Sequence, residues 1–260
     1  MGSRRVPQSG APRSQSLTRS RIGIVAALAA EARTLGRARR FPGGLRTLSD
    51  GSLLAVSGMG SDAAERSARA LVDAGCSALM SWGLAGGLDP ALSAGTIAMP
   101  AVLMLGGAPD ARDLRADSAW CERVGAVLAA RDSRSGKRVP VEAGGKLLTS
   151  RRPLASAAEK RKAFVDTGAI AVDMESYAIA SVATARGLPF VAIRVIVDGS
   201  GDDVPSILLD VAGSRGRIAA GHLLVRMLAS PRSLAPLLRL ARRYRVARRS
   251  LREAARVFGR

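Results

Sequence analysis

The chain has 260 residues, of which 47% are hydrophobic and only 3% aromatic, so it can build one large core mainly from Ala, Val, Leu and Ile. Two cysteines and a single histidine give no disulfide framework and argue against a His/Cys metal site. The formal net charge is +19, and arginines near the two ends of the chain carry most of it.

The chain begins with a basic segment, residues 1–20, that is rich in Ser, Arg, Pro and Gly and lacks apolar periodicity. This composition is typical of disorder. The apolar run from Ile22 to Ala30 imitates a signal peptide, but it is short and Glu31 closes it without a convincing cleavage site. We therefore interpret the run as the first core strand. No stretch reaches the roughly 18 apolar residues that span a bilayer.

From Ile22 onward, strand patterns alternate with helix patterns. The patterns predict strands at 22–27, 45–48, 53–57, 78–82, 96–105, 146–149, 169–172 and 190–197. They predict helices at 28–40, 119–131, 153–162, 174–185 and 211–229, and one more that begins at Ser61. Residues 83–90 and 106–118 read as loops. The alternation predicts an α/β layered domain over residues 21–230, followed by a basic helical tail at 231–260.

The most informative stretch is 169–199. A buried strand ends in Asp173-Met174-Glu175, and a later strand of residues 190–197 ends in Asp198-Gly199. In an open α/β sheet, ligands bind where strands end. An arginine inside an apolar strand is costly unless it is paired, so we expect Arg194 to face Glu175 or Asp198.

This stretch resembles the purine nucleoside phosphorylase / methylthioadenosine nucleosidase superfamily. Two other stretches agree, IGIVAALAAE at 22–31 and WGLAGGLDP at 82–90, so the resemblance covers roughly residues 22–200. It implies a three-layer α/β/α fold with a central mixed sheet. Within the superfamily the chain is most similar to the hopanoid-associated branch, which removes adenine from adenosylhopane.

The resemblance implies roles for three residues of the central stretch. Asp198 would hydrogen-bond or protonate the purine at N7, Glu175 would hold the ribose hydroxyls, and Met174 would pack against the sugar. Cleavage of a ribose–purine bond needs an acid at the base and a polar clamp on the sugar, so these residue types suit the chemistry. A carboxylate at a strand end is also a common cap or turn former, and Glu175 at a helix start could merely suit the helix dipole.

The same resemblance assigns the nucleophile's side of the site. Glu31 would polarise the attacking water and Arg194 would help to place it. Gly86 and its neighbour Ala85 would let the backbone approach the nucleoside closely. The structural alternatives are a solvated helix residue for Glu31 and an ion-pair partner for Arg194.

The sequence departs from the family pattern at three places. Val197 stands where many relatives have Ser before the catalytic Asp, and Leu84 stands where the methylthioadenosine nucleosidases carry Ser. Those enzymes also place an aromatic residue against adenine near the segment that here reads Gly145-Lys146-Leu147-Leu148, so the base would stack on Leu147 or Leu148, of which we take Leu148 as the site residue. The added apolarity fits a lipid-like substrate, although ordinary sequence drift explains it equally well.

The nucleophile is either water or phosphate. A phosphorylase needs a pocket for a dianion, and Glu31 in that pocket would repel phosphate, so the residues favour hydrolysis. Arg33 and Arg194 could neutralise Glu31 and leave room for an anion, which keeps phosphorolysis open. The turn Gly58-Met59-Gly60 is a weak candidate for a phosphate cradle. We expect no cofactor, with inorganic phosphate as the one co-substrate to test.

The C-terminal tail has a basic amphipathic pattern. Residues 234–260 hold nine arginines and one acid, Glu253. The apolar positions recur every three or four residues, as in helices that bind an anionic membrane surface, and we expect Leu237, Leu238, Tyr244, Leu251 and Phe258 to enter the lipid interface. The alternative is a helix packed on its own domain or on a partner subunit. Nucleic-acid binding is disfavoured because aromatics are scarce and no recognition motif appears.

These observations favour a cytoplasmic N-glycosidase that acts on an adenosyl-containing small molecule or lipid, with peripheral association at the inner membrane surface. One alternative is a soluble methylthioadenosine or S-adenosylhomocysteine nucleosidase. Another, from a different class, is a non-catalytic module that binds anionic surfaces. Because relatives form their sites at subunit interfaces, the resemblance also implies a homodimer.

Overall fold

The structure, a computed structural model, describes residues 21–108, 110–135, 139–204 and 234–258. The N-terminal segment 1–20 and the predicted helix at 211–229 lie outside the described residues.

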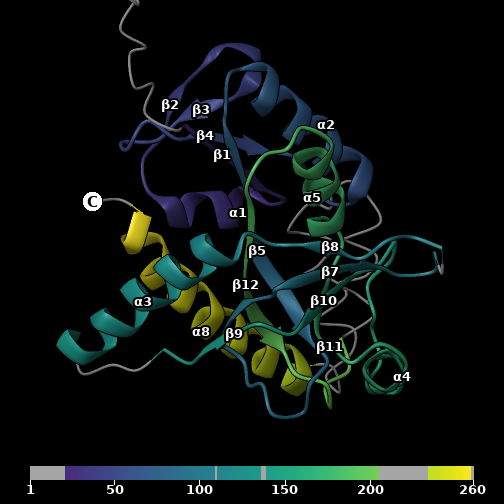
Figure 1. Cartoon of the computed structure of the whole chain (residues 1–260). Helices are drawn as coiled ribbons and strands as arrows, with labels where there is room; N and C mark the ends of the chain where they lie inside the picture. The colour runs from purple at the N-terminus through teal and green to yellow at the C-terminus, as the bar shows by residue number, and fades with distance from the viewer. Residues whose placement is uncertain (1–20, 109, 136–138, 205–233, 259–260) are drawn as a thin grey trace, which may run out of the picture.

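Twelve strands of the described chain form one mixed sheet (Figure 1). The strands are β1 (Ile22–Ala26), β2 (Arg39–Arg40), β3 (Arg46–Thr47), β4 (Leu53–Val56), β5 (Ala78–Gly87), β6 (Ile97–Met99), β7 (Val102–Leu105), β8 (Leu114–Arg115), β9 (Val141–Ala143), β10 (Lys146–Thr149), β11 (Ala169–Asp173) and β12 (Phe190–Asp198). The order along one path is β2-β3-β4-β1-β5-β11-β10-β7-β8, and a branch runs from β5 through β12 and β6 to β9.

Strand β5 is where the sheet divides. Its first half pairs in parallel with β1, its last two residues pair antiparallel with β11, and its other edge pairs in parallel with β12. The carboxyl ends of β1, β11 and β12 are therefore all brought to the second half of β5. This convergence is what positions the site.

Helices cover both faces of the sheet, as the three-layer prediction requires. The helices are α1 (Ala29–Ala32), α2 (Ser61–Asp73), α3 (Ser118–Ser135), α4 (Ala157–Thr167), α5 (Ser176–Ala185) and α8 (Leu234–Phe258), with short 3-10 helices at Arg33–Leu35 and Pro42–Gly44. Helices α2 and α5 pack together on one face, and α3 and α8 share the core of the other face (Figure 1). Helix α4 packs against β11.

Several elements differ from their sequence predictions: the segment 106–118, expected as a loop, contains β8, and the helix expected at 153–162 is shifted to Ala157–Thr167. Three further differences have a local cause. The helix expected at 28–40 stops after two short turns because Gly36 adopts a left-handed φ of 101°. The segment expected as a loop at 83–90 continues β5 as far as Gly87, because β11 and β12 supply hydrogen-bond partners on its two edges. The strand expected at 96–105 is divided into β6 and β7 around Pro100, which has no N–H for a ladder bond.

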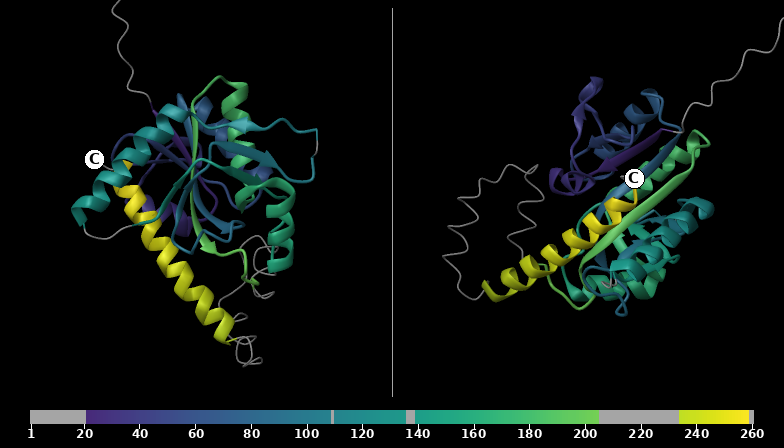
Figure 2. Two further views of the ribbon diagram at one scale, coloured as in Figure 1. Left: turned by 60° about the horizontal axis from the view of Figure 1, so that its bottom comes forward. Right: turned by 90° about the vertical axis from the view of Figure 1, so that its left-hand side faces the viewer.

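Helix α8 packs along β12 over its later turns, while its first turns extend past the rest of the domain (Figure 2). Ala247, Leu251 and Ala254 are buried in the same core as Trp120 of α3. Gly95 allows the approach, because a Cβ there would lie 2.7 Å from Cγ1 of Val246. The expectation that Leu251 enters a lipid interface is therefore wrong, and the helix is an integral part of the fold.

Candidate active site

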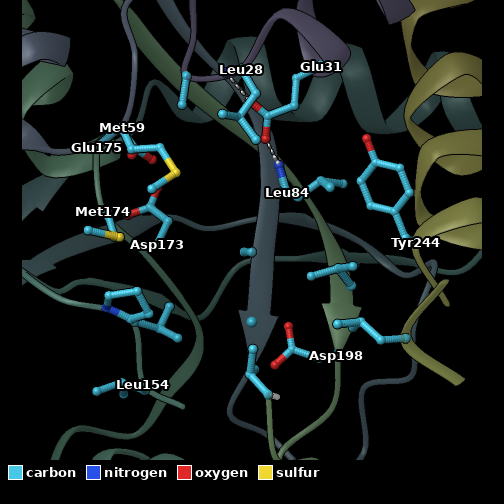
Figure 3. Close-up of a pocket in the computed structure, with 18 of the residues that line it drawn as sticks. Leu28, Glu31, Met59, Leu84, Leu154, Asp173, Met174, Glu175, Asp198 and Tyr244 are labelled. Atoms are coloured by element: carbon cyan, nitrogen blue, oxygen red, sulfur yellow. Dashed lines mark hydrogen bonds between the residues drawn. The ribbon is translucent and has the colours of Figure 1, made fainter. Parts of the chain in front are cut away.

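A pocket of about 560 Å³ lies beside the second half of β5 (Figure 3). Its wall is mainly apolar, and the described residues that line it are Ala27, Leu28, Glu31, Met59, Leu84, Ala85, Gly86, Arg152, Pro153, Leu154, Val172, Asp173, Met174, Glu175, Val197, Asp198, Val204, Leu240, Ala241 and Tyr244. The three carboxylates predicted from sequence enter it from different strand ends: Glu31 after β1, Glu175 after β11 and Asp198 at the end of β12.

Glu31 is held by two backbone N–H groups. Leu28 N–H donates to its Oε2 and Leu84 N–H donates to its Oε1, both at 2.9 Å. Burial raises the pKa of the Glu31 carboxyl above its ordinary value, even though Arg194 and the two N–H donors oppose the shift. A buried carboxyl with a raised pKa, fixed at the edge of a pocket, has the properties of a general base.

Glu175 stands across the pocket from Glu31 and is positioned by the turn before α2. Gly60 N–H donates to its Oε1 at 2.9 Å, and the Ser61 hydroxyl donates to the neighbouring Met174 carbonyl at 3.0 Å. Burial raises the pKa of Glu175, and the nearby negative charge of Asp173 adds to the shift, while Arg194 opposes it. The turn that includes Gly58 and Gly60 thus serves a carboxylate.

Arg194 lies behind the pocket wall, buried to 2% exposure. Its Nη2 lies 2.8 Å from Asp173 Oδ2 and 3.6 Å from Glu175 Oε2, which confirms the expected pairing with Glu175 and adds Asp173 as the closer partner. Burial disfavours the guanidinium charge, but the carboxylates around it outweigh that effect and raise the pKa of Arg194. Its Nη1 also donates to the Leu84 carbonyl at 3.3 Å. The arginine therefore organises the carboxylates from outside the pocket.

Arg194 and Glu31 also approach the same glycine. A Cβ at position 83 would lie 2.6 Å from Nη1 of Arg194 and 2.7 Å from Oε1 of Glu31. Both contacts are closer than real Cβ atoms tolerate, so only glycine fits at this point of β5. The close approach explains why the middle of β5 carries glycine beside the nucleophile side of the pocket.

Asp198 is buried at the far end of the pocket from Glu31 (Figure 3). Burial raises the pKa of its carboxyl, and the ammonium group of Lys160, which forms an ion pair with it, opposes the shift. Gly86 lies close by, because a Cβ there would be 3.6 Å from Asp198 Oδ2. Sequence reasoning missed Lys160, which is fully buried on α4 and is separated from Asp198 by 38 positions along the chain.

The remaining sequence-predicted residues divide into two groups. Met174, Ala85 and Gly86 line the pocket as expected. Leu148 is not among the described residues that line it: it packs in a small apolar cluster with Leu88 and with Val172, which does line the pocket, so its contact with the base stays a prediction. Its β-strand position turns the side chain into the core, and Pro153 and Leu154, a few residues later, reach the pocket instead.

Helix α8 supplies part of the pocket wall, although the sequence analysis placed residues of this helix, including Tyr244, in a lipid interface. Leu240, Ala241 and Tyr244 line the pocket, and the Tyr244 ring faces Leu84 (Figure 3). The amphipathic pattern located this face of the helix, but the sequence alone did not show that the face covers a pocket.

Two negative findings apply to the described residues. They contain no cluster of three His, Cys, Asp or Glu side chains with the arrangement of a metal site. In the same part of the chain, no helix has both the length and the apolarity that crossing a bilayer would require.

Comparison with known proteins gives a consistent family assignment. The sequence matches the phosphorylase superfamily over residues 21–229, while no curated protein sequence matches it. Among solved structures it is similar to the 5′-methylthioadenosine/S-adenosylhomocysteine nucleosidase of Neisseria meningitidis, with 20% identity, a TM-score of 0.64 and coverage of 93% of this chain and 99% of that one.

Two further structures give similar values. The Campylobacter jejuni nucleosidase of the same name has 17% identity and a TM-score of 0.60, with coverage of 75% of this chain and 94% of that one. The futalosine hydrolase of Helicobacter pylori has 16% identity and a TM-score of 0.58, with coverage of 76% and 89%. At these identities the likeness establishes the fold.

Proposed function

The chain belongs to the phosphorylase superfamily, and we propose that it cleaves the N-glycosidic bond of an adenosyl nucleoside with water as the nucleophile. The observation that carries the proposal is the convergence of Glu31, Glu175 and Asp198 on one apolar pocket. Each carboxyl group comes from a different strand end and is held by its own partners, so the three can serve the nucleophile, the sugar and the base separately.

During cleavage, positive charge develops on the sugar and negative charge develops on the departing base. As the bond between the sugar C1′ and the base N9 breaks, its electron pair goes to adenine, and Asp198 donates a proton to N7. Glu175 accepts hydrogen bonds from the ribose hydroxyls while positive charge develops on the sugar. Glu31 removes a proton from water, and the water oxygen forms the new bond to C1′.

The contacts of Glu31 support water over phosphate. A bound dianion needs backbone N–H donors, but those of Leu28 and Leu84 donate to Glu31, and that of Gly60 donates to Glu175. Arg194 is also engaged, with Asp173, Glu175 and the hydroxyls of Ser81 and Ser176. The raised pKa of Glu31 fits a group that receives a proton during turnover.

For the group attached to the sugar, we propose a lipid, with adenosylhopane as the specific substrate that the sequence resemblance implies. Support comes from the apolar wall and from its rim, where Leu28 and Met59 are 40% and 37% exposed. The alternative is methylthioadenosine or S-adenosylhomocysteine, which the names of the similar solved structures favour.

A lipid substrate would place the protein at a membrane surface. The core residues Ala247, Leu251 and Ala254 of helix α8 are buried, while Arg242, Arg245 and Arg249 are exposed. Each such arginine contributes about 1 kcal/mol near an anionic leaflet. We therefore propose that the protein binds the membrane surface peripherally through the exposed arginines of α8. From the sequence resemblance we also propose that it is a homodimer and that it is cytoplasmic.

The experiment measures adenine release from adenosylhopane in mixed vesicles and from methylthioadenosine in solution, each with and without phosphate. Release from adenosylhopane without phosphate supports the proposal. Release from methylthioadenosine alone selects the alternative substrate class, and a strict requirement for phosphate overturns hydrolysis.

The triple variant Arg242→Gln/Arg245→Gln/Arg249→Gln tests the membrane proposal. It should weaken binding to anionic vesicles and leave cleavage of a soluble substrate unchanged.

A further inference from the structure

Lys160 is a fully buried lysine whose ammonium group lies next to the carboxyl group of Asp198. Nζ donates to Asp198 Oδ2, to the Gly199 carbonyl at 3.1 Å and to the Asp202 carbonyl at 2.8 Å. An ammonium group has three N–H donors, and all three are accounted for by these acceptors. Lys160 therefore has no donor left for a substrate.

The position of Lys160 is well defined by its helix. Ser156 caps α4 by accepting from Glu159 N–H at 3.2 Å, and Glu159 Oε2 accepts from Ser156 N–H at 3.1 Å. Gly168 ends the helix in the left-handed conformation. Lys160 lies in the first turn, so the cap directly fixes the direction in which its side chain leaves the helix.

Burying the ammonium group of a lysine costs free energy, so a buried lysine suggests a role that an apolar side chain could not fill. A buried ammonium group loses its hydration, and replacing a buried ion pair by apolar residues is often neutral or stabilising. The other cations of α4 are exposed, including Lys162, which pairs with Asp166 at 2.8 Å on the surface. What distinguishes Lys160 is that its partner is the carboxyl group at the end of the pocket.

The turn after Asp198 is fixed by a second interaction, which comes from α8. Arg243 forms an ion pair with Asp202, and Asp202 Oδ2 also accepts from Gly199 N–H at 2.8 Å. Lys160 holds the same turn through its two carbonyl contacts. The backbone that follows the acid is thus held from two helices far apart in the sequence.

We propose that Lys160 is a positioning residue for the reaction: it acts through Asp198, fixing the carboxyl group beside the leaving base and ordering the turn of residues 199–202. This rests on the proposed function, in which Asp198 donates to the base. Because one ammonium group contacts both the carboxyl group and the turn, the acid keeps its orientation while charge develops on adenine.

The test is a double-mutant cycle with Lys160→Met and Asp198→Asn, measured as kcat and KM for adenine release across a range of pH. Lys160→Met alone should lower kcat about 10²-fold with a smaller change in KM, as expected for a misplaced catalytic group. In the Asp198→Asn background it should cause no further loss. Lys162→Met, two positions along the same helix, should leave kcat unchanged.

The pH profile separates positioning from general damage. Lys160 opposes the rise in the pKa of Asp198, so its removal should move the alkaline limb, where Asp198 loses its proton, to higher pH. An unmoved limb together with additive losses in the double variant would overturn the proposal. If the wild-type protein released no adenine, the proposed function itself would be wrong.

A measurement without substrate covers the case in which Lys160→Met does not fold. Asp198→Asn leaves a buried lysine unpaired, so adding Lys160→Met to it should raise the Tm above that of Asp198→Asn alone. A double variant that unfolds at a lower temperature than Asp198→Asn would show that Lys160 stabilises the fold independently of Asp198, against the proposal.

Discussion

The backbone N–H of Gly60 donates a hydrogen bond to Oε1 of Glu175, 115 positions later in the chain, at 2.9 Å. The glycine-rich turn at 58–60 therefore binds the carboxylate of Glu175, although a turn with this sequence can also bind phosphate. Because the donor is already engaged, phosphate binding at this turn would require Glu175 to move. The contact joins the sugar side of the pocket to the start of α2.

Gly60→Ala should raise KM for nucleosides while the chain still folds. Gly60 has φ 96° and ψ 158°, a conformation that is almost exclusive to glycine, so alanine costs about 1–3 kcal/mol or moves the N–H away from Glu175. Steady-state kinetics and urea unfolding measure the two effects. Gly44→Ala, at φ 79° and outside the pocket wall, is the matched control, and an equal rise in KM there would contradict the role given to Gly60.

Glu31→Gln should abolish hydrolysis and leave nucleoside binding through Glu175 in place. Glutamine has the same shape but does not take up the proton of water, and general-base catalysis contributes about 10²–10⁴-fold. Adenine release with equilibrium binding of substrate distinguishes the two effects. If the variant retained a rate that depends on phosphate, the enzyme would be a phosphorylase.

The pH dependence of activity and of stability should have opposite signs. A base acts when ionised, so kcat/KM should rise with pH through the raised pKa of Glu31, above its ordinary value of 4.5. In the folded state Glu31, Glu175 and Asp198 all have raised pKa values, so the folded chain binds more protons than the unfolded chain in that window. The free energy of unfolding should therefore fall as the pH rises through it.

Urea unfolding at a series of pH values measures the stability change. Glu31→Gln removes one of the three titrating groups and should make the decline shallower. A free energy of unfolding that increased with pH over this window would contradict the raised pKa values.

Sequence patterns predicted those parts of the site that lie at strand ends. Glu175 follows β11 by two positions and Asp198 is the last residue of β12, and ligands bind where strands end, so these two could be found without coordinates. Glu31 lies in α1, and only the resemblance to the superfamily assigned it to the site. The pairing of Arg194 was predictable for a related reason, since a charge inside an apolar strand requires a partner.

The parts that sequence did not reveal are contacts between distant segments. Lys160 looks like any charged residue in a helix, and only the packing of α4 against β11 shows that it is buried beside Asp198. Tyr244 and Leu251 gave the pattern of an amphipathic helix, which is the same for a helix on a membrane and a helix on its own sheet. Leu148 was assigned by register with relatives, and a strand turns alternate side chains to opposite faces.

Gly83→Ala should destabilise the fold and lower activity together. The added Cβ would lie 2.6 Å from Arg194 Nη1 and 2.7 Å from Glu31 Oε1, so both side chains would have to move. Overpacking of this kind costs about 1–3 kcal/mol. Gly125→Ala is the control. Gly125 lies in helix α3, where alanine is favoured over glycine by about 0.5–1 kcal/mol, and the added Cβ would lie 3.4 Å from Cε of Met99. Urea unfolding and adenine release should show loss for Gly83→Ala only.

The last prediction concerns helix α8 and uses two leucines of the same helix. Leu251 is 1% exposed in the core with Trp120, whereas Leu238 is 61% exposed. Leu251→Ala should lower the free energy of unfolding by about 2–5 kcal/mol, because it leaves a cavity in a packed core. Leu238→Ala should change it by no more than about 0.5 kcal/mol, as is usual for an exposed site. If both variants unfolded like the wild-type protein in urea, α8 would not be packed on the sheet, and the wall that Tyr244 gives to the pocket would be lost with it.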